Sequence, residues 1–137
     1  MSTAIRQGIY QKLTGTSAVT SKLSSSTAVF HEQAPSDAAY PLIIFQKSSG
    51  TRTRAFTADA FQNETWIVKA IDRNTTSDRV EALAEVIETA LNNGTITVSG
   101  KKLADLHLVG DIDYIEQDGD QQYRHAGATY RVVTTQP

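Results

Sequence analysis

The sequence predicts one α+β domain, with helices packed on one face of a mixed, mainly antiparallel sheet. Three observations point to this fold. Helix-periodic apolar residues occur near the N-terminus and again in the second half of the chain, with β-prone apolar runs between and after them. A length of 137 residues with 39% hydrophobic content suits a single core. No repeat or linker composition divides the chain, so residues 1–137 are expected to form one domain.

The N-terminal segment predicts an amphipathic helix from about Thr3 to Leu13. Apolar side chains recur there at every fourth position, at Ile5, Ile9 and Leu13, with polar residues between them. The next elements are predicted to be a short helix over 17–23, a short strand over 28–31 and a turn-rich connection over 34–39.

Two β-strands are predicted in the middle of the chain. The almost unbroken apolar run from Tyr40 to Phe45 is typical of a strand covered on both faces, so we expect it to lie centrally in the sheet. The second strand, Glu64 to Ile71, places Trp66 on the same face as other apolar residues. Tryptophan is also enriched at interface hot spots, but these apolar neighbours favour a core position for Trp66.

The segment between these strands, residues 48–63, is predicted to be a long loop. It is polar and too long for a tight hairpin turn, and loops of this length usually carry function or are mobile. Its Arg52, Arg54, Phe56 and Phe61 form the chain's basic and aromatic cluster. Two arginines are too few for a single-stranded nucleic acid site, so we expect either a solvated loop or one that orders against a partner.

The clearest helical pattern runs from about Ser77 to Asn92. Its apolar residues fall on one stripe, acidic residues lie in its first turn, and Asn93-Gly94 supplies a left-handed stop. The stripe consists of Val80, Leu83, Ala84, Ile87 and Leu91.

The last third of the chain predicts a three-stranded antiparallel meander. Alternating residues around Ile96 and Val98 suggest its first strand, followed by a turn at 99–101. A long bent strand is expected over 103–115, with a bulge at Gly110. A polar turn at 116–122, a final strand over 123–134 and an extended tail at 135–137 complete the prediction.

Composition excludes several function classes. The charges nearly cancel, giving a net charge of −2 and a pI of about 5.9, so no field of one sign attracts nucleic acid or a membrane surface. The chain has no cysteine, which removes disulfides and thiolate chemistry. The polar N-terminus does not resemble a signal peptide, and no apolar run approaches the roughly 20 residues that span a bilayer. We therefore expect a chain that is soluble and intracellular when made.

The sequence gives no pattern for catalysis, a metal or a cofactor. Residues 94–102 depart from the phosphate-loop spacing and are better explained as a hairpin. His31, His107 and His125 stand alone, and isolated histidines are more often structural. Neither 111–113 nor 118–120 forms a calcium loop. An acid–base pair among Glu64, Asp72 and Glu116 is conceivable, but exposed carboxylates are the common case. We therefore expect a non-enzymatic protein without a cofactor.

The order of these elements resembles the tail-terminator or tail-completion proteins of long-tailed bacteriophages. The resemblance rests on the strand at 40–45, the strand that carries Trp66, the amphipathic helix, and the Gly100-Lys101-Lys102-Leu103 turn. The last third is also similar to the family, with the acidic turn Asp118-Gly119-Asp120 followed by the strand from His125 to Val132. The likeness spans nearly the whole chain, although the polar segment 48–63 is longer than the family pattern.

The resemblance implies a virion protein of the head–tail interface, assembled in the host cytoplasm. Such a subunit would join copies of itself in a hexameric ring, cap the tail tube protein, end its polymerisation and dock a head-completion or connector protein, while DNA only passes through the lumen. It would contact no membrane. Within this hypothesis, the expected partner-interface residues are Arg52, Arg54, Phe56, Phe61, Tyr123, Arg124, Tyr130 and Arg131.

Four other functions remain open. A neck or head-completion protein of the same virion would bind the portal-side ring before the tube. A small enzyme would lose turnover on a change such as Asp118→Asn, and a nucleic-acid-binding module would show salt-dependent DNA affinity. A non-catalytic binding module of another kind is the last alternative.

Overall fold

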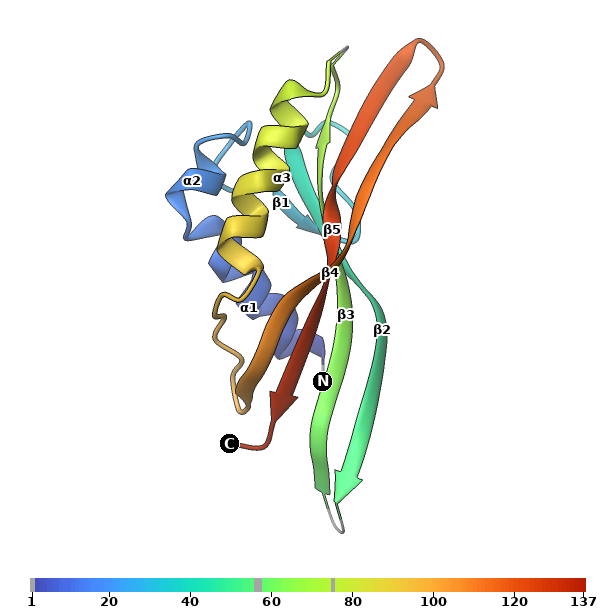
Figure 1. Cartoon of the computed structure of the whole chain (residues 1–137). Helices are drawn as coiled ribbons and strands as arrows, with labels where there is room; N and C mark the ends of the chain where they lie inside the picture. Colours follow the sequence, from blue (N-terminus) through green and yellow to red (C-terminus); the bar gives the residue numbers. More distant parts are fainter. Residues whose placement is uncertain (1, 56–57, 75) are drawn as a thin grey trace.

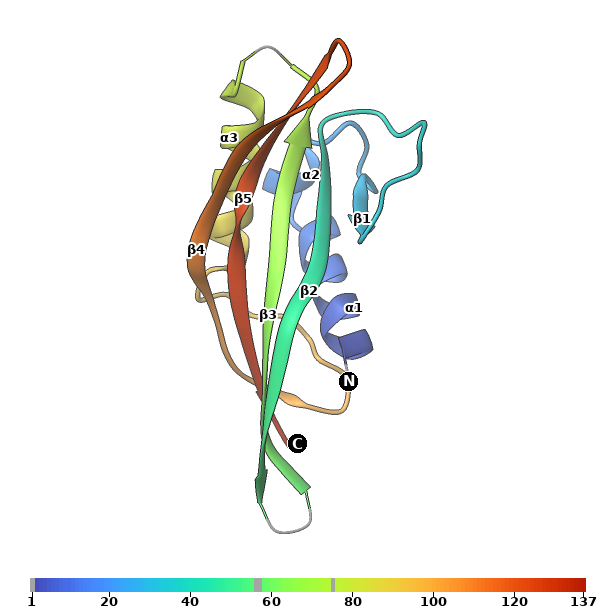
Figure 2. The same cartoon turned by 90° about the vertical axis from the view of Figure 1, so that its right-hand side faces the viewer.

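The computed structural model describes residues 2–55, 58–74 and 76–137 and confirms the α+β class. In these ranges, three helices lie on one face of a five-stranded sheet (Figures 1 and 2). The helices are α1 (Ser2–Thr14), α2 (Ser17–Thr20) and α3 (Asp78–Leu91). The strands are β1 (Val29–His31), β2 (Leu42–Ala55), β3 (Ala58–Asp72), β4 (Lys102–Asp118) and β5 (Gln121–Thr135).

The sheet is mixed but mainly antiparallel. The strand order is β1-β2-β3-β5-β4, which places β3 at the centre. Only β1 runs parallel to its neighbour, and its three residues pair with Ile43 to Phe45 of β2. The strand predicted at 40–45 therefore lies next to the centre of the sheet and not at it. Strands pair with both of its edges only over its second half.

The predicted long loop at 48–63 is wrong, because most of this segment continues β2 and β3 as a long hairpin. Arg52 pairs with Gln62 and Thr53 with Phe61, while residues 56–57 lie outside the described part of the chain. Side chains of this hairpin beyond the body are exposed, as at residues 47–52 and 61. The sequence therefore lacks the apolar alternation by which a half-buried strand is recognised.

The predicted strand around Ile96 and Val98 is also wrong. Both side chains are buried, but the segment pairs with no strand, so β4 and β5 form a hairpin instead of a three-stranded meander. The segment instead packs directly against α1. The approach is so close that a Cβ at Gly8 would lie 2.5 Å from the carbonyl oxygen of Thr97. Alternation here reflects insertion of every second side chain into the core, which a non-strand segment can also do.

The other predicted elements are found with small changes of length. Helix α3 ends as expected, with Asn93 in the left-handed region (φ 58°), and the Asn92 side chain accepts a hydrogen bond from the backbone N–H of Leu108. The β4–β5 register shifts between Leu108 and Gly110, which confirms the predicted bulge. The turn predicted over 116–122 is tighter, because β4 continues to Asp118 and β5 begins at Gln121.

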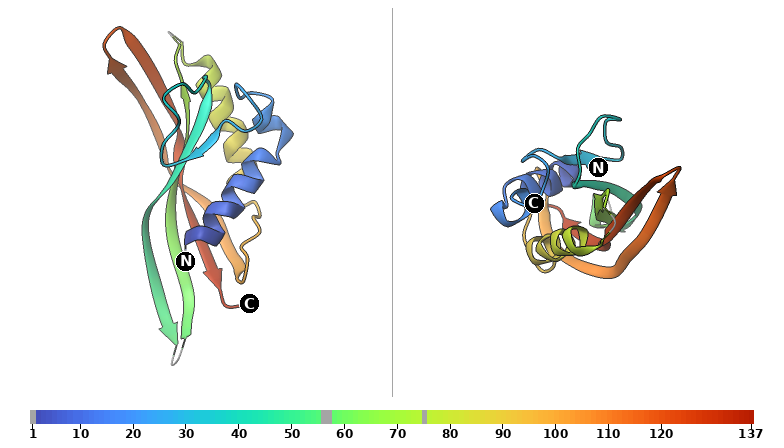
Figure 3. Two further views of the ribbon diagram at one scale, coloured as in Figure 1. Left: turned by 180° about the vertical axis from the view of Figure 1, so that it is seen from behind. Right: turned by 90° about the horizontal axis from the view of Figure 1, so that it is seen from above.

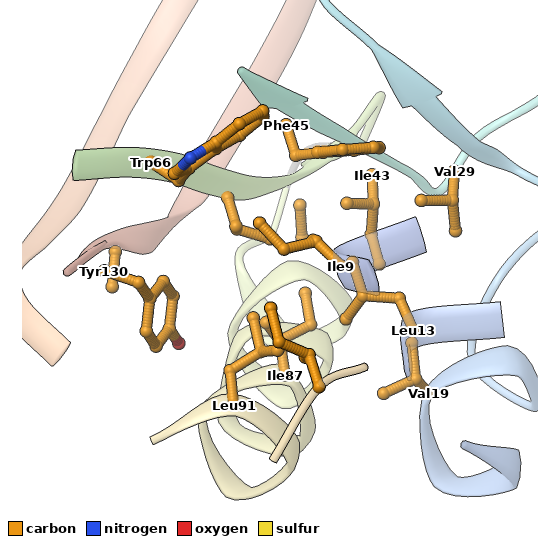
Figure 4. Packing of buried hydrophobic residues seen from close by; sticks show 14 of the residues in the cluster. Ile9, Leu13, Val19, Val29, Ile43, Phe45, Trp66, Ile87, Leu91 and Tyr130 are labelled. Carbon is orange, nitrogen blue, oxygen red and sulfur yellow. The ribbon is translucent and has the colours of Figure 1, made fainter. Parts of the chain in front are cut away.

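The main core lies between the helices and the sheet, and Trp66 is at its centre (Figure 4). Trp66 is fully buried, as predicted, and its ring lies 6.1 Å from that of Phe45. Helix α3 contributes Ile87 and Leu91 to the same cluster as the Tyr130 ring of β5 (Figure 4). A second, smaller cluster around Leu42 and Ile71 lies under the connection between β1 and β2.

The sheet is longer than the helix layer, so two hairpins extend beyond the body at opposite ends. The β2–β3 hairpin projects at one end and the β4–β5 hairpin at the other (Figures 1 and 2). Seen from behind, the helices lie between these two projections (Figure 3). We call residues 49–55 and 58–63 the β2–β3 arm, and residues 114–125 the β4–β5 arm.

The core packing gives a first prediction. Ile87→Ala should lower the free energy of unfolding by about 2–5 kcal/mol, since Ile87 is fully buried between α3 and the sheet and truncation leaves a cavity. The matched control is Glu85→Ala, an exposed position on the same helix, which should change stability by less than about 0.5 kcal/mol. Urea unfolding followed by circular dichroism measures both, and equal effects would contradict this packing.

Candidate functional site

The β2–β3 arm is anchored to the core by a buried carboxylate, Glu64. Glu64 is fully buried and accepts hydrogen bonds from Gln62 Nε2 (2.7 Å) and from the indole N–H of Trp66 (2.9 Å). The Lys47 ammonium lies 3.6 Å from the same carboxylate. A buried charge is tolerated only when such partners replace its water, so this network fixes the base of the arm against the core.

A second buried carboxylate, Asp72, joins the end of β3 to the start of α3. The Arg79 guanidinium donates two hydrogen bonds to it, from Nε at 2.8 Å and from a terminal nitrogen at 2.6 Å. The hydrogen bonds with Asp72 raise the pKa of Arg79. Bidentate pairs of this kind fix orientation as well as distance, so the pair holds α3 in place at the base of the β4–β5 arm.

The expectation that these carboxylates are exposed is therefore wrong for Glu64 and Asp72. Both side chains are fully buried, whereas 57% of the Glu116 side chain is exposed. Each of the three is held by partners within the chain. Within the described ranges, no group of three or more histidine and carboxylate side chains is placed to hold a metal ion.

The β4–β5 arm is braced at its base by an aromatic and charged cluster. Tyr114 stacks on His125 at 4.2 Å, and the Lys69 ammonium donates to the Tyr114 hydroxyl at 2.8 Å. His125 Nε2 lies 2.9 Å from Glu116 Oε1, and the ring is the donor because the carboxylate only accepts. Burial lowers the pKa of His125, against the opposing effect of the hydrogen bond to Glu116. Burial therefore favours the neutral form of His125.

Three of the predicted partner-interface residues, Arg52, Arg54 and Phe61, belong to the β2–β3 arm. Arg52 is exposed on β2, and Phe61 is 49% exposed on β3. The backbone of Arg54 belongs to β2, but its side chain is not described, and Phe56 lies outside the described residues.

The other four predicted partner-interface residues, all on β5, lie in different environments. Tyr123 packs its ring 5.6 Å from that of Tyr40, and Arg124 Nε donates to the carbonyl of Asn74. Tyr130 is 1% exposed and lies in the core, where burial raises its pKa (Figure 4). Arg131 is half-buried on the opposite sheet face. The described members of the predicted set therefore lie on the β2–β3 arm, near the base of the β4–β5 arm, on the open sheet face and in the core, and not on one surface.

The sequence analysis missed a surface along β4. Four large apolar side chains are exposed among the described residues, and three of them, Val109, Tyr114 and Ile115, lie on this strand. β4 is the edge of the sheet, so its outer backbone groups pair with no strand. The signal in the sequence is the run from Leu108 to Ile115, in which apolar residues occupy both faces of the strand rather than one.

A trough between α1 and the β1–β2 edge is a further surface feature of the described part of the chain. Its polar part lies beside Arg6, His31 and Lys47, and its apolar part beside Tyr10 and Phe30. It holds no pair of groups arranged as nucleophile and base. No helix in the described part of the chain has the length and apolar character to cross a membrane.

Comparison with known proteins identifies a family and a structural relative. The family model for tail completion protein gp17 matches residues 7–135. Among solved structures, a chain of the virion of a native gene transfer agent particle is similar, with a TM-score of 0.71 and 14% sequence identity. The similarity covers 95% of this chain and 94% of that chain, and at this identity it shows a shared fold. No curated protein matches.

The Asp72–Arg79 pair gives a second prediction. Arg79→Ala should lower the free energy of unfolding by about 1–3 kcal/mol, because it leaves the fully buried Asp72 carboxylate without its two strongest donors. Arg79→Lys keeps the charge but not the bidentate geometry, so its free energy of unfolding should lie between those of the wild type and Arg79→Ala. Urea unfolding at neutral pH is the measurement, and an unchanged midpoint for Arg79→Ala would contradict this role.

His125 gives a third prediction. Its folded pKa lies below the unfolded value of about 6.5, so the unfolded state binds more protons as the pH falls through that window. Stability should therefore decrease below about pH 6.5 and level off below the folded pKa. His125→Gln should reduce this decrease, whereas Lys22→Gln, an exposed residue outside the cluster, should keep it. Urea midpoints between pH 7.5 and 5 test this, and an unchanged pH dependence in His125→Gln would refute it.

Proposed function

Because this chain belongs to the tail completion protein gp17 family, we propose that it forms a ring on the head-proximal end of a phage tail tube. The ring ends polymerisation of the tube protein and presents the surface on which the head's connector docks. The family gives the coarser function, that of a structural protein of a virion tail. The ring, the termination of the tube and the head–tail joining surface are the proposed parts.

The observation that carries this proposal is the projection of two arms from opposite ends of one sheet. A joining subunit must contact two different partners on opposite sides, the tube below and the connector above. The β2–β3 arm and the β4–β5 arm lie in this arrangement, with the helix layer between them (Figure 1). Each arm is fixed at its base, by the Glu64 network and by the Tyr114–His125 stack respectively. Fixed arms bind with a smaller loss of conformational entropy than flexible loops.

The ring is supported by the shape of the sheet. Ring contacts are heterologous, so each subunit needs two different and complementary sides. The two sheet edges differ here, because β4 is a long strand at one edge while β1 at the other edge is short. A hexamer is the expected size, and DNA passes through its lumen.

The residues proposed for partner contacts are those expected from the sequence. Arg52, Arg54, Phe56 and Phe61 would contact the partner at the β2–β3 end. Tyr123 and Arg124 lie near the base of the β4–β5 arm, and Arg131 lies on the sheet face away from the helices. The buried Tyr130 ring would support that strand from the core. The proposed role uses no reaction, metal or cofactor and involves no membrane.

The first experiment for this function is light scattering across a concentration series, with and without the tail-tube protein. We expect a ring by itself, or a ring that forms when the tube protein is added. Substoichiometric amounts should also stop tube growth, measured as tube length by electron microscopy, since one ring blocks one tube end. Phe61→Ser should weaken tube capping, while Ala18→Ser, a matched polar change at an exposed position of α2, should not.

Two results would separate the alternatives. A persistent monomer that leaves tube growth unchanged would refute the terminator function. Binding to the portal-side ring without any effect on the tube would instead assign the chain to the neck as a head-completion protein.

A further inference from the structure

We propose that adjacent subunits are joined edge to edge, with β4 of one copy pairing with the outer edge of β2 in the next copy. The partner is thus a second copy of this chain. The inference rests on the proposed ring and specifies the surface that builds it.

The first side of this contact is β4. It extends over 17 residues, pairs on one side only with β5, and carries Val109, Tyr114 and Ile115 exposed. A long edge strand with exposed apolar side chains is a hazard for uncontrolled association unless a partner covers it. Exposed apolar residues that gather on one strand mark an interaction site more strongly than scattered ones.

The second side is the part of β2 beyond β1. β1 pairs with β2 only as far as Phe45, so from Gln46 to Ala55 no strand lies beside the outer edge of β2 among the described residues. This stretch is ten residues long, and an antiparallel register that sets Thr51 beside Ile112 brings residues 108–117 of β4 alongside it, including Val109, Tyr114 and Ile115. Two such edges can share main-chain hydrogen bonds, which is the mode by which strands are added to an existing sheet.

The direction of the strands fits a ring. From β2 through β3 and β5 to β4, each strand is antiparallel to the one before it, so β4 runs opposite to β2. A rotation about a ring axis roughly along the strands leaves β2 of the next copy in the same direction as β2 of the first. β4 and the neighbouring β2 would therefore meet antiparallel, and the alternation would continue from subunit to subunit.

Charge selects this pairing over the symmetric one. β2 from residue 46 to 55 carries three basic residues, of which Lys47 is already paired with Glu64, and no acidic one, whereas β4 carries five acidic residues and one lysine. Two β4 edges brought together in a twofold dimer would set acidic residues against acidic residues, which is destabilising. The basic residues are Lys47, Arg52 and Arg54, and the acidic ones are Asp105, Asp111, Asp113, Glu116 and Asp118.

Cysteine cross-linking tests the contact directly, because the chain contains no cysteine. Thr51 lies on β2 on the face opposite the helices, and the register places Asp105, His107 and Ile112 of β4 on that same face. Thr51→Cys combined with a cysteine at one of these three positions should give, on oxidation, a ladder of covalent oligomers that ends at the ring. Antiparallel neighbours have their Cβ atoms about 4.5–5.5 Å apart, within reach of a disulfide after small adjustment.

The matched control uses the alternation of side chains along a strand. Asp111 lies on the helix-covered face, since it aligns through Ala128 and Val68 with the buried Phe45. Thr51→Cys with Asp111→Cys should therefore give no ladder. Thr51→Cys with Lys22→Cys, an exposed position next to α2, should also give none.

Charge reversal gives an independent readout. Arg52→Glu should shift the light-scattering mass from ring towards monomer at a given concentration. In the register that sets Thr51 beside Ile112, Arg52 lies beside Asp111, so adding Asp111→Arg should restore the ring. Lys22→Glu makes the same charge change on the helix side and should leave the mass unchanged. Circular dichroism melting of each variant separates loss of the ring from loss of the fold.

The outcomes distinguish the two proposals. Rings that form, cap tubes and yield no ladder from any of the three same-face pairs would overturn the edge pairing and leave the terminator function standing. Absence of any ring with the tube protein present would overturn both.

Discussion

The structure depends on the position of Trp66 at the centre of the sheet. Its ring fills the space between β3 and the helix layer, and its indole N–H donates to the buried Glu64 carboxylate on the same strand. Apolar packing and a charged network thus meet at one side chain. β3 lies between β2 and β5. A change in the position of the Trp66 ring would therefore shift both neighbouring strands, and with them the β2–β3 arm.

The features relevant to function lie where the sheet continues past this core. Within the body most buried side chains are apolar, and the two fully buried carboxylates are paired, Glu64 with Lys47 and Asp72 with Arg79. Beyond the body, the two arms keep strand geometry because their bases are fixed, by Glu64 at one end and by the Tyr114–His125 stack at the other. A rigid body with fixed projections suits assembly between neighbours, which agrees with membership in a family of tail completion proteins.

The errors in the sequence-based prediction share one physical origin. The segment 48–63 was expected to be a loop because its described side chains are mostly exposed or polar and show no apolar alternation, and because the two strands of the β2–β3 arm pair with each other. Residues 96–98 were expected to be a strand because their alternation reports burial and not pairing. Glu64 and Asp72 were expected to be exposed because the cations that permit their burial, Lys47 and Arg79, are identified only by contact in space.

The sequence by itself determined the fold class, α1, α3 and their stops, the bulge at Gly110 and the buried place of Trp66, and the resemblance to a phage tail family. The structural features follow from local periodicity or from the conformational freedom of one residue, whereas the resemblance rests on the order and spacing of the predicted elements. Only the tertiary structure decided the strand order, the two arms, the buried carboxylates and the open edge of β4. Those depend on which distant segments pair, and pairing is a property of hydrogen bonds and contacts in space that no local pattern records.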